Sequence, residues 1–216
     1  MRQLFRYRFV VGAILALAVV PAFGQLSVDA RGPVRERKWE VAGGQGGGTG
    51  RRLALAVAVR QLDGKRSTEA RKPDVAFVLT NNGNEPITLP TSPHPGDFEP
   101  NDQNTGFEVE TLALGIGLRA DPRTAVISTI LNGSSERSGS LATLAPGESM
   151  EVIVSAKLPT APSAALSTSP FQASAILSHE VIQVKHGKRI SNLEERGSAW
   201  SRPFALELPE SSRPTP

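Results

Sequence analysis

The sequence contains no cysteine among its 216 residues and has one tyrosine, two tryptophans and three histidines. Without cysteine the chain can form no disulfide and cannot carry the lipid-modified cysteine of bacterial lipoproteins, so its stability must come from a hydrophobic core. The scarcity of tyrosine and tryptophan removes the aromatic surfaces on which sugars and single-stranded nucleic acids usually stack. These absences already limit the classes of chemistry and ligand that the protein can use.

The N-terminal segment combines basic residues with a short apolar run. Three arginines among the first eight residues precede the uncharged run Val10–Val20, and Pro21 ends it before the small-residue site Ala22–Gly24. We predict a secretory signal peptide over residues 1–24, cleaved before Gln25. An uncleaved signal anchor is the alternative, but the apolar run is shorter than the ~20 residues of a spanning helix. The mature protein is therefore expected to be periplasmic or secreted, with no membrane span after cleavage.

Charge is balanced once this segment is removed. The signal peptide holds three of the 24 basic residues, which leaves 21 basic against 21 acidic residues in the remainder. Residues 31–72 are strongly basic and residues 73–122 strongly acidic. We expect these two blocks to neutralise each other across adjacent strands, and we therefore expect no nucleic-acid partner.

The remainder divides into three parts by composition. Residues 25–50 show no apolar periodicity and end in a glycine-rich stretch, which is typical of a flexible tether. Residues 51–209 carry the folding signals of one domain, and residues 210–216 are expected to form a disordered tail.

Apolar residues within 51–209 alternate with a period of two, which indicates β-strands. Proline, glycine and asparagine separate the strands at short intervals, and no segment has a helical period. We predict an all-β fold, a two-sheet antiparallel immunoglobulin-like β-sandwich of eight or nine strands. The clearest segments are 53–59, 75–79, 86–89, 107–118, 124–131, 150–158, 171–184 and 200–208.

Turn and strand chemistry is most specific at two places. Asn81–Asn84 offers residues that tolerate positive φ in a tight turn, and Pro146–Gly147 fits the central positions of a type II turn. The strand after Gly147 is predicted to bury Met150, Val152 and Val154 and to expose Glu151. A switch in the apolar pattern near Thr111 predicts a β-bulge there.

Two of these motifs carry a family resemblance. FVLTNNGNEPITLP (Phe77–Pro90) and TLAPGESMEVIVSAKLP (Thr143–Pro159) resemble a hairpin and a later strand of bacterial exported immunoglobulin-like domains, including the CARDB-type adhesion-related modules and related uncharacterised secreted domains. The resemblance implies an immunoglobulin-like fold and a role in binding or scaffolding. It implies no catalytic residue.

Signatures of enzyme chemistry fail at specific positions. His179 and Glu180 begin an HExxH pattern, but Gln183 occupies the place of the second histidine. His94, His179 and His186 are therefore interpreted as surface or hairpin histidines. No GxSxG elbow and no phosphate-binding loop occur in the sequence. We expect no catalytic residue and no cofactor.

One acidic loop resembles a calcium-binding template. Asp97, Glu99, Asn101 and Glu108 occupy its first, third, fifth and twelfth positions, whereas Asp102 stands where the turn requires glycine. Pro100 also stiffens the loop and no helices flank it. We interpret residues 97–108 as a solvated acidic loop and keep these five residues as the candidate metal ligands.

The sequence therefore predicts an exported, non-enzymatic module that binds or scaffolds a protein or cell-surface partner. An exported enzyme or accessory subunit with an acidic site built from loops is one alternative, and a carbohydrate-binding module is another. Fold class does not separate the three, since β-sandwiches serve all of them.

Overall fold

The computed structural model describes residues 26–32, 50–62, 72–94, 106–159, 171–185 and 188–207. In this part of the chain the secondary structure is all β, with eleven strands and no helix, as the alternating sequence predicts. The described residues accordingly include no helix long and apolar enough to cross a membrane. The strands are β1 (Leu26–Asp29), β2 (Gly50–Arg52), β3 (Leu55–Gln61), β4 (Asp74–Asn81), β5 (Ile87–Pro90), β6 (Gly106–Leu118), β7 (Asp121–Gly133), β8 (Leu141–Leu144), β9 (Ser149–Ser155), β10 (Phe171–Lys185) and β11 (Lys188–Trp200).

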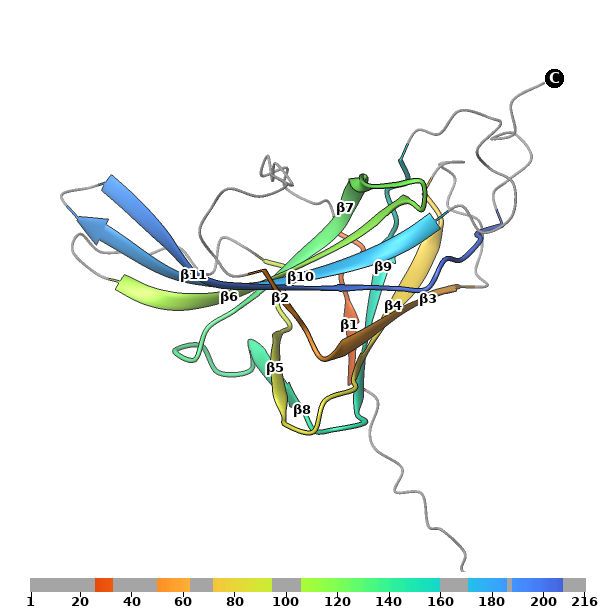
Figure 1. The fold of residues 1–216 in the computed structure, drawn as a ribbon. Helices are drawn as coiled ribbons and strands as arrows, with labels where there is room; N and C mark the ends of the chain where they lie inside the picture. Colours follow the sequence, from red (N-terminus) through yellow and green to blue (C-terminus); the bar gives the residue numbers. More distant parts are fainter. Residues whose placement is uncertain are drawn as a thin grey trace, which may run out of the picture.

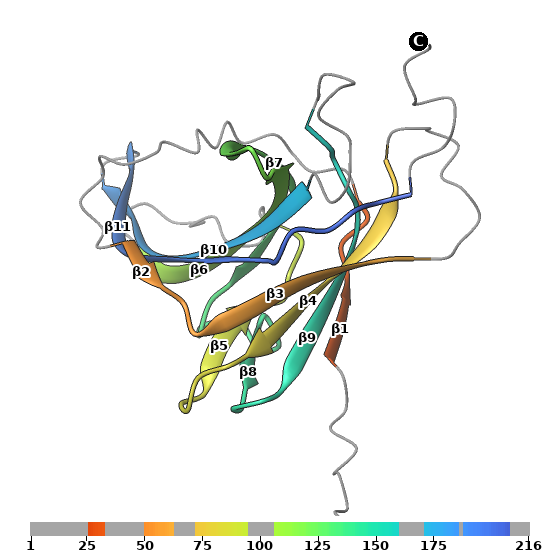
Figure 2. The same cartoon turned by 45° about the vertical axis from the view of Figure 1, so that its right-hand side comes forward.

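The strands form three hydrogen-bonded sheets. One sheet has the order β1-β9-β4-β3, the second has the order β2-β11-β10-β6-β7, and β5 pairs with β8 alone. All pairings are antiparallel except β1 with β9 and β2 with β11, which are parallel. Figures 1 and 2 show the five-stranded sheet curving over the four-stranded one.

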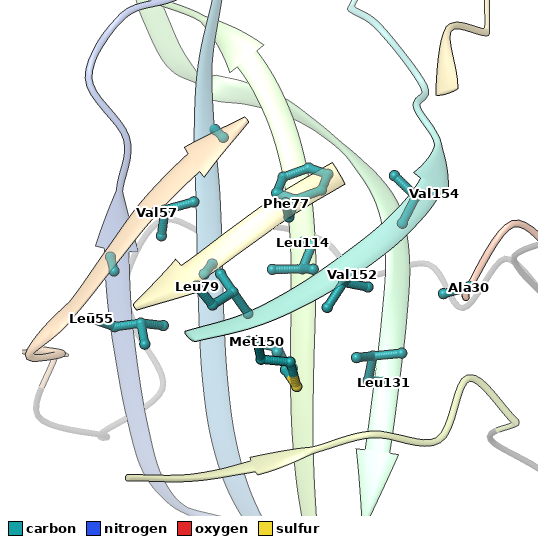
Figure 3. Close-up of a cluster of buried hydrophobic side chains, with 14 of the residues drawn as sticks. Ala30, Leu55, Val57, Phe77, Leu79, Leu114, Leu131, Met150, Val152 and Val154 are labelled. Carbon is teal, nitrogen blue, oxygen red and sulfur yellow. The ribbon is translucent and has the colours of Figure 1, made fainter. Parts of the chain in front are cut away.

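The hydrophobic core lies between the two larger sheets. Phe77 and Leu79 of β4 and Met150 of β9 are fully buried there. They face Leu114 of β6 and Leu131 of β7 from the opposite sheet (Figure 3). Apart from Phe77 and Phe171, the buried side chains of this core are aliphatic, which is expected of a sequence so poor in aromatic residues.

Strand β9 confirms the alternation predicted for it, with one exception on its outer face. Met150, Val152 and Val154 are fully buried in the core. Glu151 was expected to be solvent-exposed, but only 11% of its side chain is accessible and it forms an ion pair with Arg60 of β3. The expectation was wrong because neighbouring strands flank β9 on both sides, and a long arginine reaches across β4 to cover the carboxylate.

The two predicted turns have different outcomes. Gly147 has φ +84° and the Glu148 amide donates to Ala145 O at 3.0 Å, which confirms the type II turn. At the other turn Gly83 has no positive φ, and Asn81 lies in β4 with its side chain buried. Asn81 acts through its side-chain amide rather than through an unusual backbone conformation.

The segment predicted as a tether, residues 25–50, contains strand β1, and β2 begins at its last residue, Gly50. Leu26 of β1 is aligned with Met150 of β9, and β2 is aligned with residues 196–198 of β11. Arg31 adds ion pairs to Asp29 at 2.6 Å and to Asp74 of β4 at 3.6 Å. Residues 26–32 are therefore part of the sheet, contrary to the tether prediction, because β9 offers an edge that pairs with a short alternating segment. Residues 33–49, the predicted signal peptide and the predicted tail lie outside the described residues.

Strand β6 runs without a break at Thr111. It is aligned with β10 from Gly106 to Leu118, and its register shifts against β7 occur later, after Leu114 and after Ile116. The predicted bulge at Thr111 was wrong because both faces of the strand are buried beyond this point, Leu112 on one face and Ala113 on the other. Burial on both faces produces the same change in the apolar pattern as a bulge.

The last strand also differs from the prediction. Residues 200–208 were expected to pair, but β11 ends at Trp200. Beyond it Phe204 makes one isolated bridge to Phe171. Pro203, which has no amide hydrogen to donate, lies between the end of β11 and this bridge, so a regular ladder does not continue across it. The strand instead extends backward to Lys188. Strands β1, β2 and β8 were not predicted, and with them the described residues form eleven strands instead of eight or nine.

Candidate functional site

Three strands of the five-stranded sheet extend beyond the four-stranded sheet and form a projecting arm (Figure 1). We call this part the three-stranded arm: residues 106–110 of β6, 179–185 of β10 and 188–195 of β11. Val109 and Ile182 form a small buried cluster of their own on one face of it, packed with Phe107. The opposite face of the arm is the continuation of the core-facing side of the sheet, and a groove lies on it.

The groove has a volume of about 600 Å³ and lies where the arm joins the domain. One wall comes from the arm and the adjoining sheet, and the other comes from the β4–β5 connection and the residues between β2 and β3. Its described lining consists of Arg52, Leu53, Ala54, Gly83, Asn84, Glu85, Pro86, Ile87, Thr88, Glu110, Leu177, His179, Glu195 and Gly197.

A row of ionisable residues crosses the arm at the base of the groove. His179 of β10 is aligned with Glu110 of β6 on one side and with Glu195 of β11 on the other. Directly opposite residues of neighbouring strands share a face of the sheet, so the three side chains project to the same side. On β10 the core-facing residue next to His179 is Leu177, and on β6 the core-facing residue next to Glu110 is Leu112. The row therefore marks the end of the apolar part of this face.

His179 and Glu110 form the closest contact in this row. His179 Nδ1 lies 2.9 Å from Glu110 Oε1, and each side chain is about one quarter exposed, 28% and 27%. With Glu110 ionised, Nδ1 carries the proton and donates it to the carboxylate, which leaves Nε2 for a second partner. Glu108 Oε2 lies 3.9 Å from Nε2. The imidazole is therefore held between two carboxylates of one strand.

Burial raises the pKa of Glu110 above its ordinary value. The hydrogen bond and the charge of His179 act in the opposite direction, while the carboxylates of Glu195 and Glu108 raise the pKa further. Desolvation disfavours the charged form of a carboxyl group, and nearby negative charges have the same effect. Glu110 thus takes up a proton at higher pH than a solvated glutamate, in a place open to a ligand.

Asn81 fixes the opposite wall of the groove. Its Nδ2 donates to Glu85 O at 2.8 Å and to Leu144 O at 2.9 Å, while its Oδ1 accepts from the Gly83 amide at 2.9 Å. The next residue ties this wall to the β2–β3 connection, since the Asn82 amide donates to Ala54 O at 2.9 Å. These bonds fix the backbone of this wall to β8 and to the β2–β3 connection.

The lining offers little for covalent catalysis. Thr88 is the one described lining residue with a hydroxyl group, and its Oγ1 lies 3.4 Å from Thr143 Oγ1. A nucleophile needs a base within hydrogen-bond reach, whereas the contacts of the His179 ring here are with carboxylates. Among the described residues no three His, Asp or Glu side chains are placed to hold a metal ion.

The candidate metal ligands are placed only in part. Asp97, Glu99, Asn101 and Asp102 lie outside the described residues. Glu108 lies in β6 with its side chain two-thirds exposed, and its carboxylate faces His179. The calcium interpretation of this loop therefore stays a prediction.

Sequence reasoning missed most of this site. His179 was interpreted as a surface or hairpin histidine, and Glu110 and Glu195 were not singled out. A signal was present, because His179 continues the inward phase of Ala173, Ala175 and Leu177 along one strand. A polar residue at a core-facing position needs a partner, but the identity of that partner depends on strand register.

Comparisons with known proteins found no protein family that matches the chain and no match among curated proteins.

Proposed function

We propose that the protein is an exported, non-enzymatic binding module that holds part of a protein or cell-surface partner in the groove at the base of the three-stranded arm. The observation that carries the proposal is a preformed groove of about 600 Å³ with the row Glu110, His179 and Glu195 at its base. Ligand sites in proteins commonly have this size and combine apolar walls with a few convergent polar groups. Leu53, Ile87 and Leu177 supply the apolar part here.

Strand order supports an immunoglobulin-like classification of the domain. In such folds strands A, B and E share one sheet, while G, F, C and C′ share the other. The order β3-β4-β9 corresponds to A, B and E, and the order β11-β10-β6-β7 corresponds to G, F, C and C′. The pair β5 and β8 and the parallel edge strands β1 and β2 are then additions to this arrangement. This correspondence agrees with the resemblance to exported immunoglobulin-like modules, whose implied role is binding or scaffolding.

Binding is favoured over catalysis by the composition of the groove. His179 is held by carboxylates, and the described lining lacks a hydroxyl group that this histidine could activate. The described lining also has no phenylalanine, tyrosine or tryptophan, which disfavours stacking of a sugar ring. A peptide segment needs neither feature and can use the hydrogen-bonding groups of the rim.

The groove can be tested in cells by placing a photo-crosslinking amino acid at Thr88 on its rim and, as a matched control, at Glu136 on an exposed turn. We expect a discrete cross-linked partner at Thr88 that is absent at Glu136. Adding Glu110→Ala and His179→Ala should abolish the adduct while leaving the melting temperature of the protein above growth temperature. The same adducts at both positions, or an adduct that survives the double substitution, would contradict the proposal.

Export can be tested separately by N-terminal sequencing of the protein recovered from the extracytoplasmic fraction. The basic start, the short apolar run and the small-residue site predict a first residue of Gln25. Recovery of membrane-bound protein that retains Met1 would show that the segment is an anchor.

A further inference from the structure

Among the described strands, none pairs with the outer edge of β11 along the three-stranded arm, and we call this edge the free edge. The β11 residues from Lys188 to Glu195 pair with β10 on one side, whereas β2 covers the other side only opposite residues 196–198. No other described strand pairs with this edge. A free edge presents a row of unpaired backbone amide and carbonyl groups that can accept a further strand.

The same strand carries the exposed apolar side chains of the described residues. Ile190, Leu193 and Trp200 are 41%, 40% and 41% exposed, and they are the three large hydrophobic residues with this property. Two of them lie on the free edge of the arm. Native proteins usually protect edge strands with charge or with short length. Here the charges stand at the two ends of a long edge and the exposed apolar residues lie between them, which is the arrangement of a place where a strand of opposite charge pattern can dock.

The charges along this edge identify the occupant. The sequence from residue 188 to 195 is KRISNLEE, basic at its start and acidic at its end. β10 covers one edge of β11. When the remaining edges of two copies pair with each other about a two-fold axis, the pairing is antiparallel. Antiparallel pairing places the basic start of each strand opposite the acidic end of the other.

We propose that β11 pairs with β11 of a second copy of this chain, centred on Ser191, so that the protein forms a symmetric dimer with a continuous sheet across both arms. In this register Lys188 stands opposite Glu194 and Ile190 stands opposite Asn192. The two Ile190 residues become diagonal neighbours on one face, within the range at which cross-strand side chains interact. The charge match occurs twice because of the symmetry.

Sedimentation equilibrium of the protein recovered from cells that express the full chain tests the dimer. We expect a monomer–dimer equilibrium at protein concentrations between about 1 and 500 µM. The dissociation constant of the dimer should increase as the salt concentration rises. Glu194→Lys replaces both charge matches with like-charge contacts and should raise the dissociation constant about tenfold or more. Glu136→Lys makes the same charge change on an exposed turn and should leave the dissociation constant unchanged.

The reciprocal exchange makes the test specific. Adding Lys188→Glu to Glu194→Lys restores opposite charges and should return the dissociation constant to near its original value. A protein that is monomeric throughout this range overturns the proposal, and so does a dimer that Glu194→Lys leaves intact or that the exchange does not restore. Equal melting temperatures of the two lysine variants at monomeric concentration will show that the fold is not the cause.

The absence of cysteine permits an independent test of the register. Ser191→Cys places the one thiol of each copy on the two-fold axis, where opposite Cα atoms lie within the ~4.4–6.8 Å that a disulfide spans. We expect mild oxidation to give a disulfide-linked dimer as the main product. Thr143→Cys, an exposed position on β8, serves as the control. Equal cross-linking at the two positions would overturn the register.

Discussion

Asn81 connects three parts of the chain through one side chain. Its amide group bonds to Glu85 O, Leu144 O and the Gly83 amide, and it is fully buried. Removing it leaves two carbonyls and one amide without these partners at the wall of the groove. A buried polar group that loses its partner costs stability in proportion to its desolvation.

We predict that Asn81→Ala lowers the free energy of unfolding by about 2–4 kcal/mol, since several buried backbone groups become unsatisfied together. Chemical denaturation measures the change. Asn84→Ala, at an exposed position in the same connection, should change it by less than about 0.5 kcal/mol. Similar losses for the two variants would show that Asn81 does not organise this wall.

The Glu110–His179 contact makes a prediction about protonation. Because the hydrogen bond and charge of His179 lower the pKa of Glu110 while burial raises it, His179→Ala should raise that pKa further. Carbon-detected NMR titration of the Glu110 carboxyl measures the shift directly. Thr88→Ala at the rim should leave the pKa of Glu110 where it is in the parent protein.

The sign of the linked stability follows from the same shift. A carboxyl group whose pKa is raised by folding binds its proton more tightly in the folded state. The stability that this group contributes is therefore fully present at pH values below its pKa in the unfolded chain. It is lost as the pH rises through the higher pKa that the group has in the folded protein. A folded Glu110 with a pKa below its ordinary range would contradict this account of the groove.

At the level of elements, the two faces of β9 have different surroundings. One face lies in the hydrophobic core, and on the other face Glu151 forms an ion pair with Arg60. Val152→Asp puts a charge among apolar side chains of both sheets and should cost more than about 4 kcal/mol, which is most of the stability of a domain at the lower end of the usual range of about 5–15 kcal/mol. Glu151→Lys puts a second cation beside Arg60 and should cost about 1–3 kcal/mol, because Arg60 is partly solvated.

Thermal and chemical denaturation rank these β9 variants. The double variant Arg60→Glu with Glu151→Arg exchanges the two charges and keeps an ion pair. It should therefore lose less free energy of unfolding than Glu151→Lys alone. Glu136→Lys on an exposed turn should fall within about 0.5 kcal/mol of the parent. Equal effects of Val152→Asp and Glu151→Lys would show that the two faces of β9 are not distinct.

The sequence predicted elements best where the pattern was local. The alternation from Met150 to Val154 and the Pro146–Gly147 turn follow from neighbouring residues alone. Strand β1 was missed because four residues carry little periodicity and their partner lies in β9, more than one hundred residues later. Glu151 and the Glu110–His179 pair were missed for the same reason, since both depend on register between strands distant in sequence.

For the molecule as a whole, the acidic residues of 97–108 raise the question of calcium. We predict no change in melting temperature at millimolar calcium, because Pro100 and Asp102 oppose the turn that a calcium loop requires. A site with a dissociation constant of ~0.1 mM would add about 1.4 kcal/mol at ten times that concentration. A calcium-dependent rise in melting temperature that Asp97→Asn with Glu108→Gln abolishes would overturn this prediction.

The parallel pairing of β1 with β9 also sets an order of events during synthesis. Leu26 is translated 124 residues before Met150, its partner in the sheet. At the usual 5–20 residues per second, β1 waits about 6–25 s for the strand that it joins. Contacts of such long sequence separation slow folding, because the loop between them must close before they contribute. The first of the described strands to be synthesised is therefore expected to be among the last to join its sheet.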